Sequence, residues 1–313
     1  AGNSTYNTYT GAGSSTLSVE LPNGLYLGST DKVLPEFKDT TIGFAALAQG
    51  EDLVPFKYRL PDMTPTSVEV KVEYCGLCGS DDHLIVGDYG EYAVWPQVCG
   101  HEVVGTVTQV GTAVTTLKAG QRVGVGWQSS SCHDCEWCAR GDEQLCSSVG
   151  CTCCEGNKGG FADRMRLNDS QFCYKIPDAL SSAEVAPLLC GGQTVWTPLN
   201  EQTKSSDRVG ILGLGGLGHM AIKFAKALGR EVTAISSSAS KRADALSHGA
   251  SRFLVHTNQE EMDALVRRYM TQVKQAIQDF ETKYEKRIRN LRITSNLPNV
   301  EDYLGSFRKN MTN

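Results

Sequence analysis

Alternating apolar and polar residues mark the first half of the chain. The stretch SVEVKVEYCG, residues 67–76, alternates with a period of two, which is typical of a β-strand with one buried face. GHEVVGTVTQVG, residues 100–111, predicts two more short strands, with glycines at the turns. TLSVELP, residues 16–22, predicts one strand in an extension otherwise rich in Ser, Thr, Gly and Asn. The pattern favours a many-stranded unit, a small β-barrel.

The second half changes to helical and mixed patterns. Residues 181–199 predict a helix that Ser181 or Ser182 can cap, with Glu184 in its first turn. Residues 207–236 then read as a buried strand, a glycine turn, a helix and a second strand. The helix keeps Ala221, Phe224, Ala225 and Leu228 on one face, and Gly229 ends it. This order predicts the start of a doubly wound α/β domain.

The expected α/β pattern stops after a second helix, residues 238–250, and a short strand, residues 252–256. Residues 259–293 instead predict one long helix with a heptad stripe that Arg287 interrupts. The stripe consists of Val266, Met270, Val273, Ile277, Phe280, Tyr284 and Leu291. Two interpretations stay open: self-association into a homo-oligomer through this helix, or an amphipathic helix packed on its own domain.

These patterns divide the chain into four parts. They are a loosely structured extension (1–40), a β-rich catalytic domain (41–200), a partial nucleotide-binding domain (201–258) and a helical tail (259–313). Its 313 residues suit two folded domains.

Charge and hydropathy exclude two kinds of partner. The net charge of -5 offers no general basic field for nucleic acid. The apolar runs are much shorter than the ~20 residues that a membrane-spanning helix needs. The opening AGNSTYNTYTGAGSST has neither the basic start and apolar core of a signal peptide nor the arginines of a transit peptide. We therefore expect a cytoplasmic protein.

Twelve cysteines need an explanation, and four of them crowd into CHDCEWCARGDEQLC. Cys132, Cys135, Cys138 and Cys146 have the spacing of a metal cage in a reducing compartment. Disulfides are the alternative, but a chain of this length can build a core without them. Four thiolates would close a tetrahedral zinc site and leave no position for a substrate, so we expect a structural zinc ion here.

The loop GLGGLG follows the predicted strand and opens the predicted helix. In this context Gly213, Gly215 and Gly218, with Gly216 and Leu217 between them, let the backbone approach a pyrophosphate. The next strand ends in three serines and a lysine rather than an acid, a set that suits the 2′-phosphate of NADP. These residues are Ser236, Ser237, Ser238 and Lys241. The alternative is a capped helix start with solvated bases.

Three further segments offer ligands for a second metal. Cys78 lies in YCGLCGSDDH, His101 in CGHE and Cys190 in PLLCGG. A catalytic zinc needs three protein ligands and one open position, and Cys190 is the third candidate, although a lone cysteine in an apolar segment is normally just a small hydrophobe. Asp81 can orient the histidine.

Together and in this order, the motifs resemble those of the zinc-dependent medium-chain alcohol dehydrogenases, most closely the cinnamyl-alcohol-dehydrogenase-like branch. The likeness runs from about Thr41 to His256. It implies a GroES-like β-barrel catalytic domain, then a partial Rossmann domain and a C-terminal helical tail, an α/β plus β fold.

The resemblance also implies the chemistry. A catalytic zinc is expected on Cys78, His101 and Cys190, with Glu102 as a neighbour or transient ligand. Ser80 would contact the substrate oxygen and pass its proton towards His83. With the four-cysteine cage this makes two Zn²⁺ per chain and an NADP-dependent enzyme acting on a small alcohol or aldehyde.

The sequence departs from that branch in three places. Cys99 stands where the branch more often has proline. Cys151, Cys153 and Cys154 are free thiols, an alternative zinc ligand set or sites of oxidation. The second half of the cofactor domain is replaced by the heptad helix. A shortened or fused, catalytically impaired derivative that acts as a zinc-binding assembly protein therefore stays open. A polyol dehydrogenase also stays open, because of the CGSD string at residues 78–81.

Overall fold

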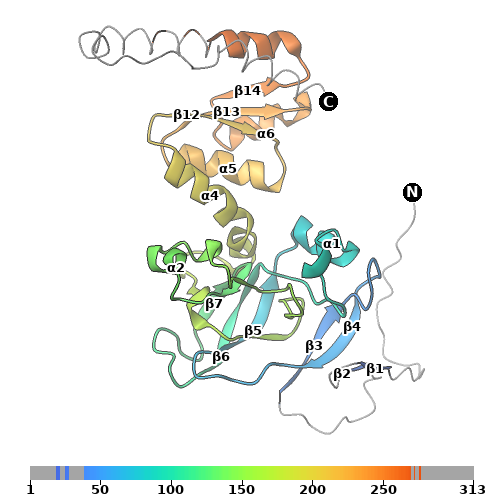
Figure 1. The fold of residues 1–313 in the computed structure, drawn as a ribbon. Helices are drawn as coiled ribbons and strands as arrows, with labels where there is room; N and C mark the ends of the chain where they lie inside the picture. Colours follow the sequence, from blue (N-terminus) through green and yellow to red (C-terminus); the bar gives the residue numbers. More distant parts are fainter. Residues whose placement is uncertain (1–18, 22–24, 28–38, 269–270, 272–274, 276–313) are drawn as a thin grey trace, which may run out of the picture.

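The computed structural model describes residues 19–21, 25–27, 39–268, 271 and 275. They form a β-rich unit and an α/β unit, which helix α4 connects (Figure 1). The β-rich unit contains β1 Val19–Leu21, β2 Leu25–Leu27, β3 Thr40–Ala45, β4 Val54–Arg59, β5 Val68–Cys75, α1 Gly79–Val86, η1 Gly90–Tyr92, β6 Val103–Val110, β7 Arg122–Val125, β8 Gln128–Ser130, α2 Glu136–Arg140, η2 Glu143–Leu145, β9 Gly150–Cys151, β10 Arg164–Leu167, η3 Ser170–Phe172, β11 Cys173–Lys175, α3 Ser182–Val185 and η4 Ala186–Leu189. The α/β unit contains α4 Gly191–Gln202, β12 Arg208–Leu212, α5 Gly216–Ala227, β13 Glu231–Ser236, η5 Ala239–Lys241, α6 Arg242–Ser247 and β14 Arg252–Val255.

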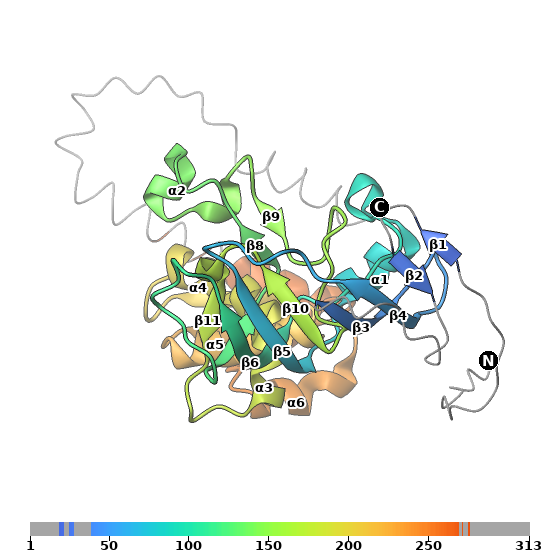
Figure 2. The same ribbon diagram turned by 90° about the horizontal axis from the view of Figure 1, so that it is seen from below.

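An antiparallel sheet forms the centre of the β-rich unit, in the order β10-β5-β6-β7-β11. The alternating stretch at 67–76 is strand β5, as predicted, and its Val68 and Val70 are fully buried in the core. Figure 2 shows this sheet from below, with the hairpin β3–β4 beside it. The pairing among the described strands does not test closure into a barrel, so the barrel stays a prediction.

The prediction of two short strands in residues 100–111 was wrong. The structure has one strand, β6, because Gly105 does not turn the chain but continues the ladder opposite Val72. A Cβ at Gly105 would lie 2.1 Å from the carbonyl oxygen of Lys71. The glycine therefore allows a close approach of two strands, the other common use of glycine inside a sheet.

The predicted strand-helix-strand unit is present, as a parallel sheet in the order β12-β13-β14 with helices α5 and α6. Ile222 and Ala225 of α5 are fully buried against Val232 and Ala234 of β13. Gly229 follows the helix with a φ of +80°, the left-handed conformation expected there. Leu199 of α4 belongs to the same core.

The region of the predicted long helix is described only at its start. Residues 259–268 are helical, and the Asn258 side chain caps them by accepting from the backbone N–H groups of Glu260 and Glu261. Val266 of the heptad stripe is 37% exposed. The rest of the stripe, from Met270 to Leu291, and most of the extension 1–40 lie outside the described residues. The four domain boundaries stay predictions.

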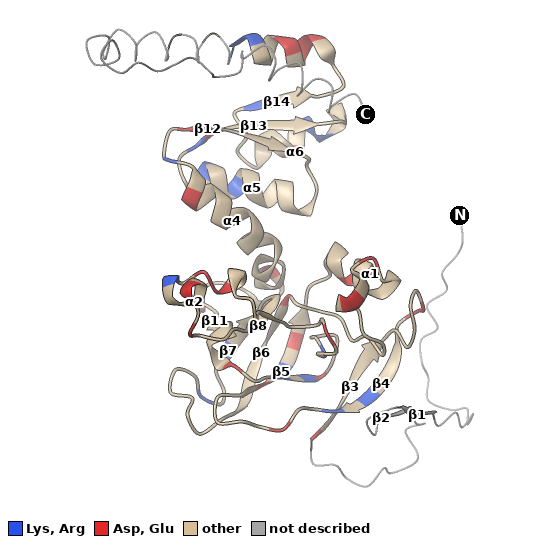
Figure 3. Cartoon of the chain, viewed as in Figure 1, with Lys and Arg blue, Asp and Glu red and all other residues tan. Residues whose placement is uncertain are grey.

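Two general expectations can be compared with the described residues. Among them, no helix has both the length and the apolar character required to cross a membrane. Lysine and arginine positions are interspersed with aspartate and glutamate positions along both units in Figure 3.

Candidate active site

The three segments that were expected to supply a catalytic metal site meet in the structure. Ligand atoms of Cys78, His101, Glu102 and Cys190 all lie within 4.8 Å of one another. The two sulfurs are 3.9 Å apart. Two sulfurs bound to one tetrahedral zinc at ~2.3 Å each would lie about 3.8 Å apart. The donor set and its spacing therefore fit Zn²⁺.

Helix α1 positions the first ligand. Cys78 is its N-cap residue, and the Cys78 sulfur accepts a hydrogen bond from the Ser80 backbone N–H at 3.5 Å. Burial raises the pKa of this thiol, but the hydrogen bonds from Ser80 and the proximity of His101 outweigh it, so the pKa lies below the ordinary value. A helix N-terminus stabilises a thiolate, which is the form that binds metal. Cys190 lies at the break between η4 and α4.

Asp81 holds the second ligand in place from the same helix. Its Oδ1 lies 3.2 Å from Nδ1 of His101 and accepts from the backbone N–H of Gly100 at 2.9 Å. Its Oδ2 accepts from the backbone N–H of Cys78 at 3.0 Å. With Nδ1 engaged, Nε2 is the nitrogen available for a metal. Burial lowers the pKa of His101, but the hydrogen bonds to Asp81, Cys153 and Cys190 raise it above its usual range.

Glu102 supplies a carboxylate with an unused oxygen. The side chain is buried, and no donor among the described residues reaches its Oε2. Gly76 makes room for it, because a Cβ there would lie 2.0 Å from this oxygen. Burial raises the pKa of Glu102. A buried polar atom without a partner is costly, and a cation among these residues would satisfy it.

Ser80 and His83 lie near one another on helix α1, but their partners were not evident from the sequence. Ser80 Oγ accepts a hydrogen bond from the Tyr89 hydroxyl at 3.3 Å. The Tyr89 ring packs against the His83 ring, with centroids 5.5 Å apart, and His83 Nδ1 lies 2.8 Å from Asp88 Oδ2. The contacts run from Ser80 to Tyr89 by a hydrogen bond and from Tyr89 to the exposed ring of His83 by ring packing.

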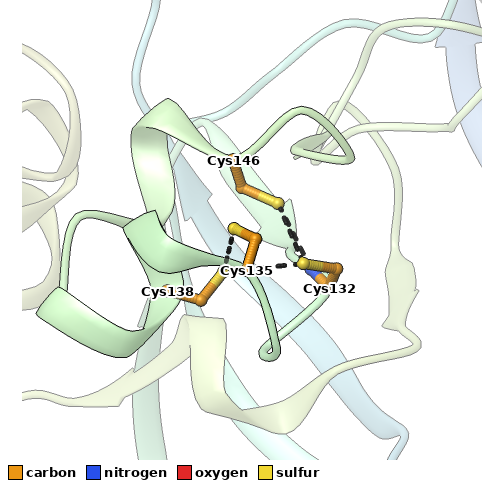
Figure 4. A group of neighbouring side chains, drawn as sticks. All are labelled: Cys132, Cys135, Cys138 and Cys146. Carbon is orange, nitrogen blue, oxygen red and sulfur yellow. Dashed lines mark hydrogen bonds between the residues drawn. The ribbon is translucent and has the colours of Figure 1, made fainter.

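The four cysteines of the lobe converge as predicted. Figure 4 shows their sulfurs turned towards one another around helix α2. The Sγ–Sγ distances are 3.5 Å for Cys135–Cys138, 3.5 Å for Cys132–Cys146 and 3.9 Å for Cys132–Cys138. Hydrogen bonds led by one from Ser131 lower the pKa of Cys138 to about 7, whereas the Asp134 carboxylate raises that of Cys132 to about 12. A divalent cation would favour the thiolate at all four positions.

The glycine loop has the geometry of a phosphate-binding turn. Gly213 has a φ of +88°, and a Cβ at Gly218 would lie 1.9 Å from the Gly213 carbonyl oxygen. Open space surrounds Gly215 and Gly216, where an added Cβ would meet nothing within 4 Å. No side chain caps the N-terminus of α5 at Gly215. Its free N–H groups therefore face a space that can hold an anion. Leu217, beside them, is 49% exposed.

The end of strand β13 adjoins this loop. Lys241 donates from Nζ to the Leu214 carbonyl oxygen at 3.0 Å. Ser237 is exposed and Ser238 half-buried. Ser236 is buried, and its hydroxyl accepts from the Ser238 backbone N–H at 3.2 Å, so it shapes the turn. His219 and His248 flank a cavity of about 230 Å³ beside the loop, and the sequence did not single them out.

The unassigned cysteines lie directly behind the predicted zinc site. Cys151 and Cys154 form a disulfide. Cys153 is buried, with its sulfur 3.9 Å from His101 Nδ1, and Cys99 packs in the same buried cluster. The crowding of thiols in CTCC was the only sequence signal for this arrangement.

Comparison with known proteins identifies the family. Residues 64–178 match the alcohol dehydrogenase GroES-like domain, and residues 216–279 match the zinc-binding dehydrogenase family. A cinnamyl alcohol dehydrogenase from Ocimum basilicum is 44% identical over 243 residues, covering 74% of this chain and 68% of that protein. The chain belongs to the zinc-dependent alcohol dehydrogenases of the cinnamyl alcohol dehydrogenase branch. The resemblance seen in the sequence motifs is thereby confirmed.

Other members of this branch show how much of the fold is shared. A probable cinnamyl alcohol dehydrogenase from Nicotiana tabacum is 45% identical over 236 residues, or 72% of this chain and 66% of the relative. The structure of a cinnamyl alcohol dehydrogenase from Sorghum bicolor superposes with a TM-score of 0.68 at 41% identity, over 72% of this chain and 67% of that one. One from Helicobacter pylori, complexed with NADP(H), gives 0.64 at 32% identity, over 69% and 65%. The chain thus spans about two thirds of the length of these relatives.

Proposed function

We propose that the chain is a zinc- and NADP(H)-dependent oxidoreductase that interconverts primary alcohols, aromatic or aliphatic, and aldehydes. The observation that carries the proposal is the meeting of Cys78, His101 and Cys190 beside the unpartnered oxygen of Glu102. Three protein ligands leave a fourth position open, which distinguishes a catalytic from a structural zinc. The names of the relatives, cinnamyl alcohol dehydrogenases, support the same activity.

The residues of the site divide the work of the reaction. When bound, Zn²⁺ supplies Lewis acidity that lowers the pKa of an alcohol, and the nicotinamide accepts the hydride. Asp81 keeps the His101 ring in one orientation and one tautomer, with Nδ1 towards its carboxylate. Glu102 contributes a second carboxylate beside the metal.

Ser80 receives the proton that the alcohol loses. The Ser80 hydroxyl can accept the proton from the substrate oxygen and donate its own proton to the next group, as general acid-base catalysis requires. The Tyr89 hydroxyl donates to Ser80 Oγ at 3.3 Å, and the exposed His83, paired with Asp88 and packed on the Tyr89 ring, would be the base nearer solvent. His83 is thus the residue at which the proton leaves the protein.

NADP is the expected nucleotide because hydroxyls and a cation follow strand β13. The pyrophosphate would lie at the N-terminus of α5, on Gly215, Gly216 and Leu217, with Gly213 and Gly218 shaping the turn. Ser237, Ser238 and Lys241 would contact the 2′-phosphate, with Ser236 supporting the turn from below. The four-cysteine cage would hold the second zinc ion and stabilise its lobe.

The deciding experiment combines metal analysis with a reductase assay. Zinc-replete protein should contain about two zinc ions per chain and oxidise NADPH when given cinnamaldehyde or aliphatic aldehydes. Cys78→Ser should lose one zinc and the activity, and the matched variant Cys173→Ala, in the sheet core, should keep both. Failure of the zinc-replete protein to oxidise NADPH with any aldehyde would favour the zinc-binding assembly role, whereas preference for sorbitol would favour a polyol dehydrogenase.

A further inference from the structure

The turn that follows strand β9 holds three thiols that neither zinc site uses. Cys151, Cys153 and Cys154 place their sulfur atoms within 4.8 Å of one another. Cys151 and Cys154 are half-buried and disulfide-bonded, while Cys153 between them is 1% exposed and keeps a free thiol. The group therefore changes from one thiol to three when the disulfide is reduced.

Hydrogen bonds hold this turn in place independently of the disulfide. The Thr152 backbone N–H donates to the Trp127 carbonyl oxygen at 2.7 Å, and its hydroxyl donates to that of Gly126 at 2.6 Å. Gln97, fully buried, donates from Nε2 to the Cys153 carbonyl oxygen at 2.6 Å.

Asn157 secures the two ends of the same turn. Its side-chain amide donates to the Cys151 carbonyl oxygen at 2.8 Å, and its backbone N–H donates to that of Cys154 at 2.9 Å. All three cysteine backbones are thus fixed by bonds that do not involve sulfur. Opening the disulfide leaves the sulfurs gathered, so binding a metal to them would require little ordering of the chain.

We propose that residues 151–154 form a third, redox-gated metal site, which binds Cu⁺ through Cys151, Cys153 and Cys154 once the disulfide is reduced. A set of three sulfurs without oxygen or nitrogen ligands selects a soft ion, because thiolates favour Cu⁺ over harder cations. While the disulfide is intact, Cys153 is the one free thiol of the turn. The turn then lacks the three thiolate ligands that the site needs.

The reduction is balanced with a phosphine as reductant. The phosphine gives two electrons to the Cys151–Cys154 bond and takes the oxygen of one water molecule to become a phosphine oxide. The two hydrogens of that water go to the two sulfurs. Cu⁺ then displaces the thiol protons, which pass to the buffer.

The position of the site links it to the predicted catalytic zinc. Cys153 Sγ lies 3.9 Å from His101 Nδ1, on the same side of the ring as Asp81. A Cu⁺ ion bound to Cys153 would lie behind His101, outside the set formed by Cys78, His101 and Cys190.

The test measures Cu⁺ uptake by zinc-loaded protein before and after phosphine treatment, by competition with a chromophoric Cu⁺ chelator under anaerobic conditions. The number of free thiols per chain should rise by two after treatment. About one additional Cu⁺ should then bind per chain, with the zinc content unchanged. Equal uptake before and after reduction would overturn the proposal.

Variants locate the ion. Cys151→Ser with Cys154→Ser should abolish the additional uptake, and Cys153→Ser should weaken it at least about tenfold while leaving the disulfide able to form. Cys173→Ala removes a cysteine far from the turn and should bind like the unaltered protein. Retention of the additional Cu⁺ in the double variant, or an unaltered Cu⁺ affinity in Cys153→Ser, would refute the site, and Cys153→Ser decides the matter if the double variant fails to fold.

Discussion

The carboxylate of Asp81 joins the imidazole of His101 to the first turn of helix α1. One oxygen lies 3.2 Å from His101 Nδ1, and the other accepts from the backbone of Cys78. Both residues are buried, with 5% of each side chain exposed. The Asp81 side chain thus orients the His101 ring and holds the backbone of Cys78, so it supports two of the predicted metal ligands.

Asp81→Asn should therefore weaken zinc binding at this site about 10- to 100-fold, because the amide supports the imidazole less strongly than a carboxylate. Chelator competition, with metal analysis to count the remaining zinc, measures the change. Asp82→Asn is the matched control, since Asp82 is the exposed next residue of the same helix and should leave zinc affinity unaltered. Equal affinity in the two variants would contradict the role of Asp81.

Ser80→Ala should lower kcat for aldehyde reduction by on the order of 10²-fold without loss of zinc, because the substrate oxygen loses its proton partner. Tyr89→Phe, which removes only the hydroxyl 3.3 Å from Ser80 Oγ, should lower kcat by a smaller factor. Tyr92→Phe serves as control, as Tyr92 is 56% exposed and makes no side-chain contact to Ser80 that the structure records. An unaltered kcat in Ser80→Ala would exclude the proposed relay.

Lys241→Glu should raise the KM for NADPH about tenfold and affect that for NADH less, because a carboxylate repels the 2′-phosphate. Steady-state kinetics with both nucleotides measures the ratio. Lys223→Glu, at an exposed position of helix α5, introduces the same charge away from the serine turn. A parallel rise for both nucleotides would mean that Lys241 only maintains the loop through its bond to Leu214.

Arg166→Met should destabilise the β-rich unit by roughly 1.5–3 kcal/mol, the usual contribution of hydrogen bonds to charged groups, because Glu69 keeps its contact with Arg164 Nη1 at 3.1 Å. Arg166 donates from Nη2 to Glu69 Oε2 and to Asp39 Oδ1, both at 2.6 Å. Arg59→Met is the control, because its pair with Asp62 is exposed and such pairs contribute at most about 1 kcal/mol. Denaturant unfolding measures both, and equal effects would contradict the prediction.

The same network predicts a pH dependence. The hydrogen bond from Arg166 lowers the pKa of Asp39. Burial raises the pKa of Glu69, but hydrogen bonds from Thr108 and Arg166 outweigh it, so that pKa is also lowered. These contributions to stability are present above the ordinary carboxyl pKa of about 4 and are lost as the pH falls through the lowered values. Arg166→Met should reduce this acid sensitivity.

Much of the site was predictable because its motifs are local. Cys78 with Asp81 and the four-cysteine lobe each fit within fifteen residues, where spacing alone constrains geometry. The glycine loop was equally clear, since its position between a strand and a helix fixes how the backbone runs. The position of Cys190 depended on the order of motifs rather than on its own surroundings.

Other features depend on contacts that spacing cannot show. Tyr89 reaches Ser80 only because Gly87, with a φ of +81°, reverses the chain after helix α1. Three thiols in four residues allow several pairings, so the bond between Cys151 and Cys154 could not be chosen from the sequence. Gly105 was misread because a glycine in a turn and one that lets a paired strand approach closely look alike in a sequence.

The two predicted zinc sites differ in how much of the chain must be synthesised before each can bind its ion. Cys132 and Cys146 are 14 positions apart in the sequence, whereas Cys78 and Cys190 are 112 positions apart. Closing the longer loop costs about 2 kcal/mol more entropy, at roughly 0.6 kcal/mol per doubling. During synthesis the lobe can capture its ion as soon as Cys146 has left the ribosome. The other site requires Cys190, so the lobe would be filled first if both ions bind during translation.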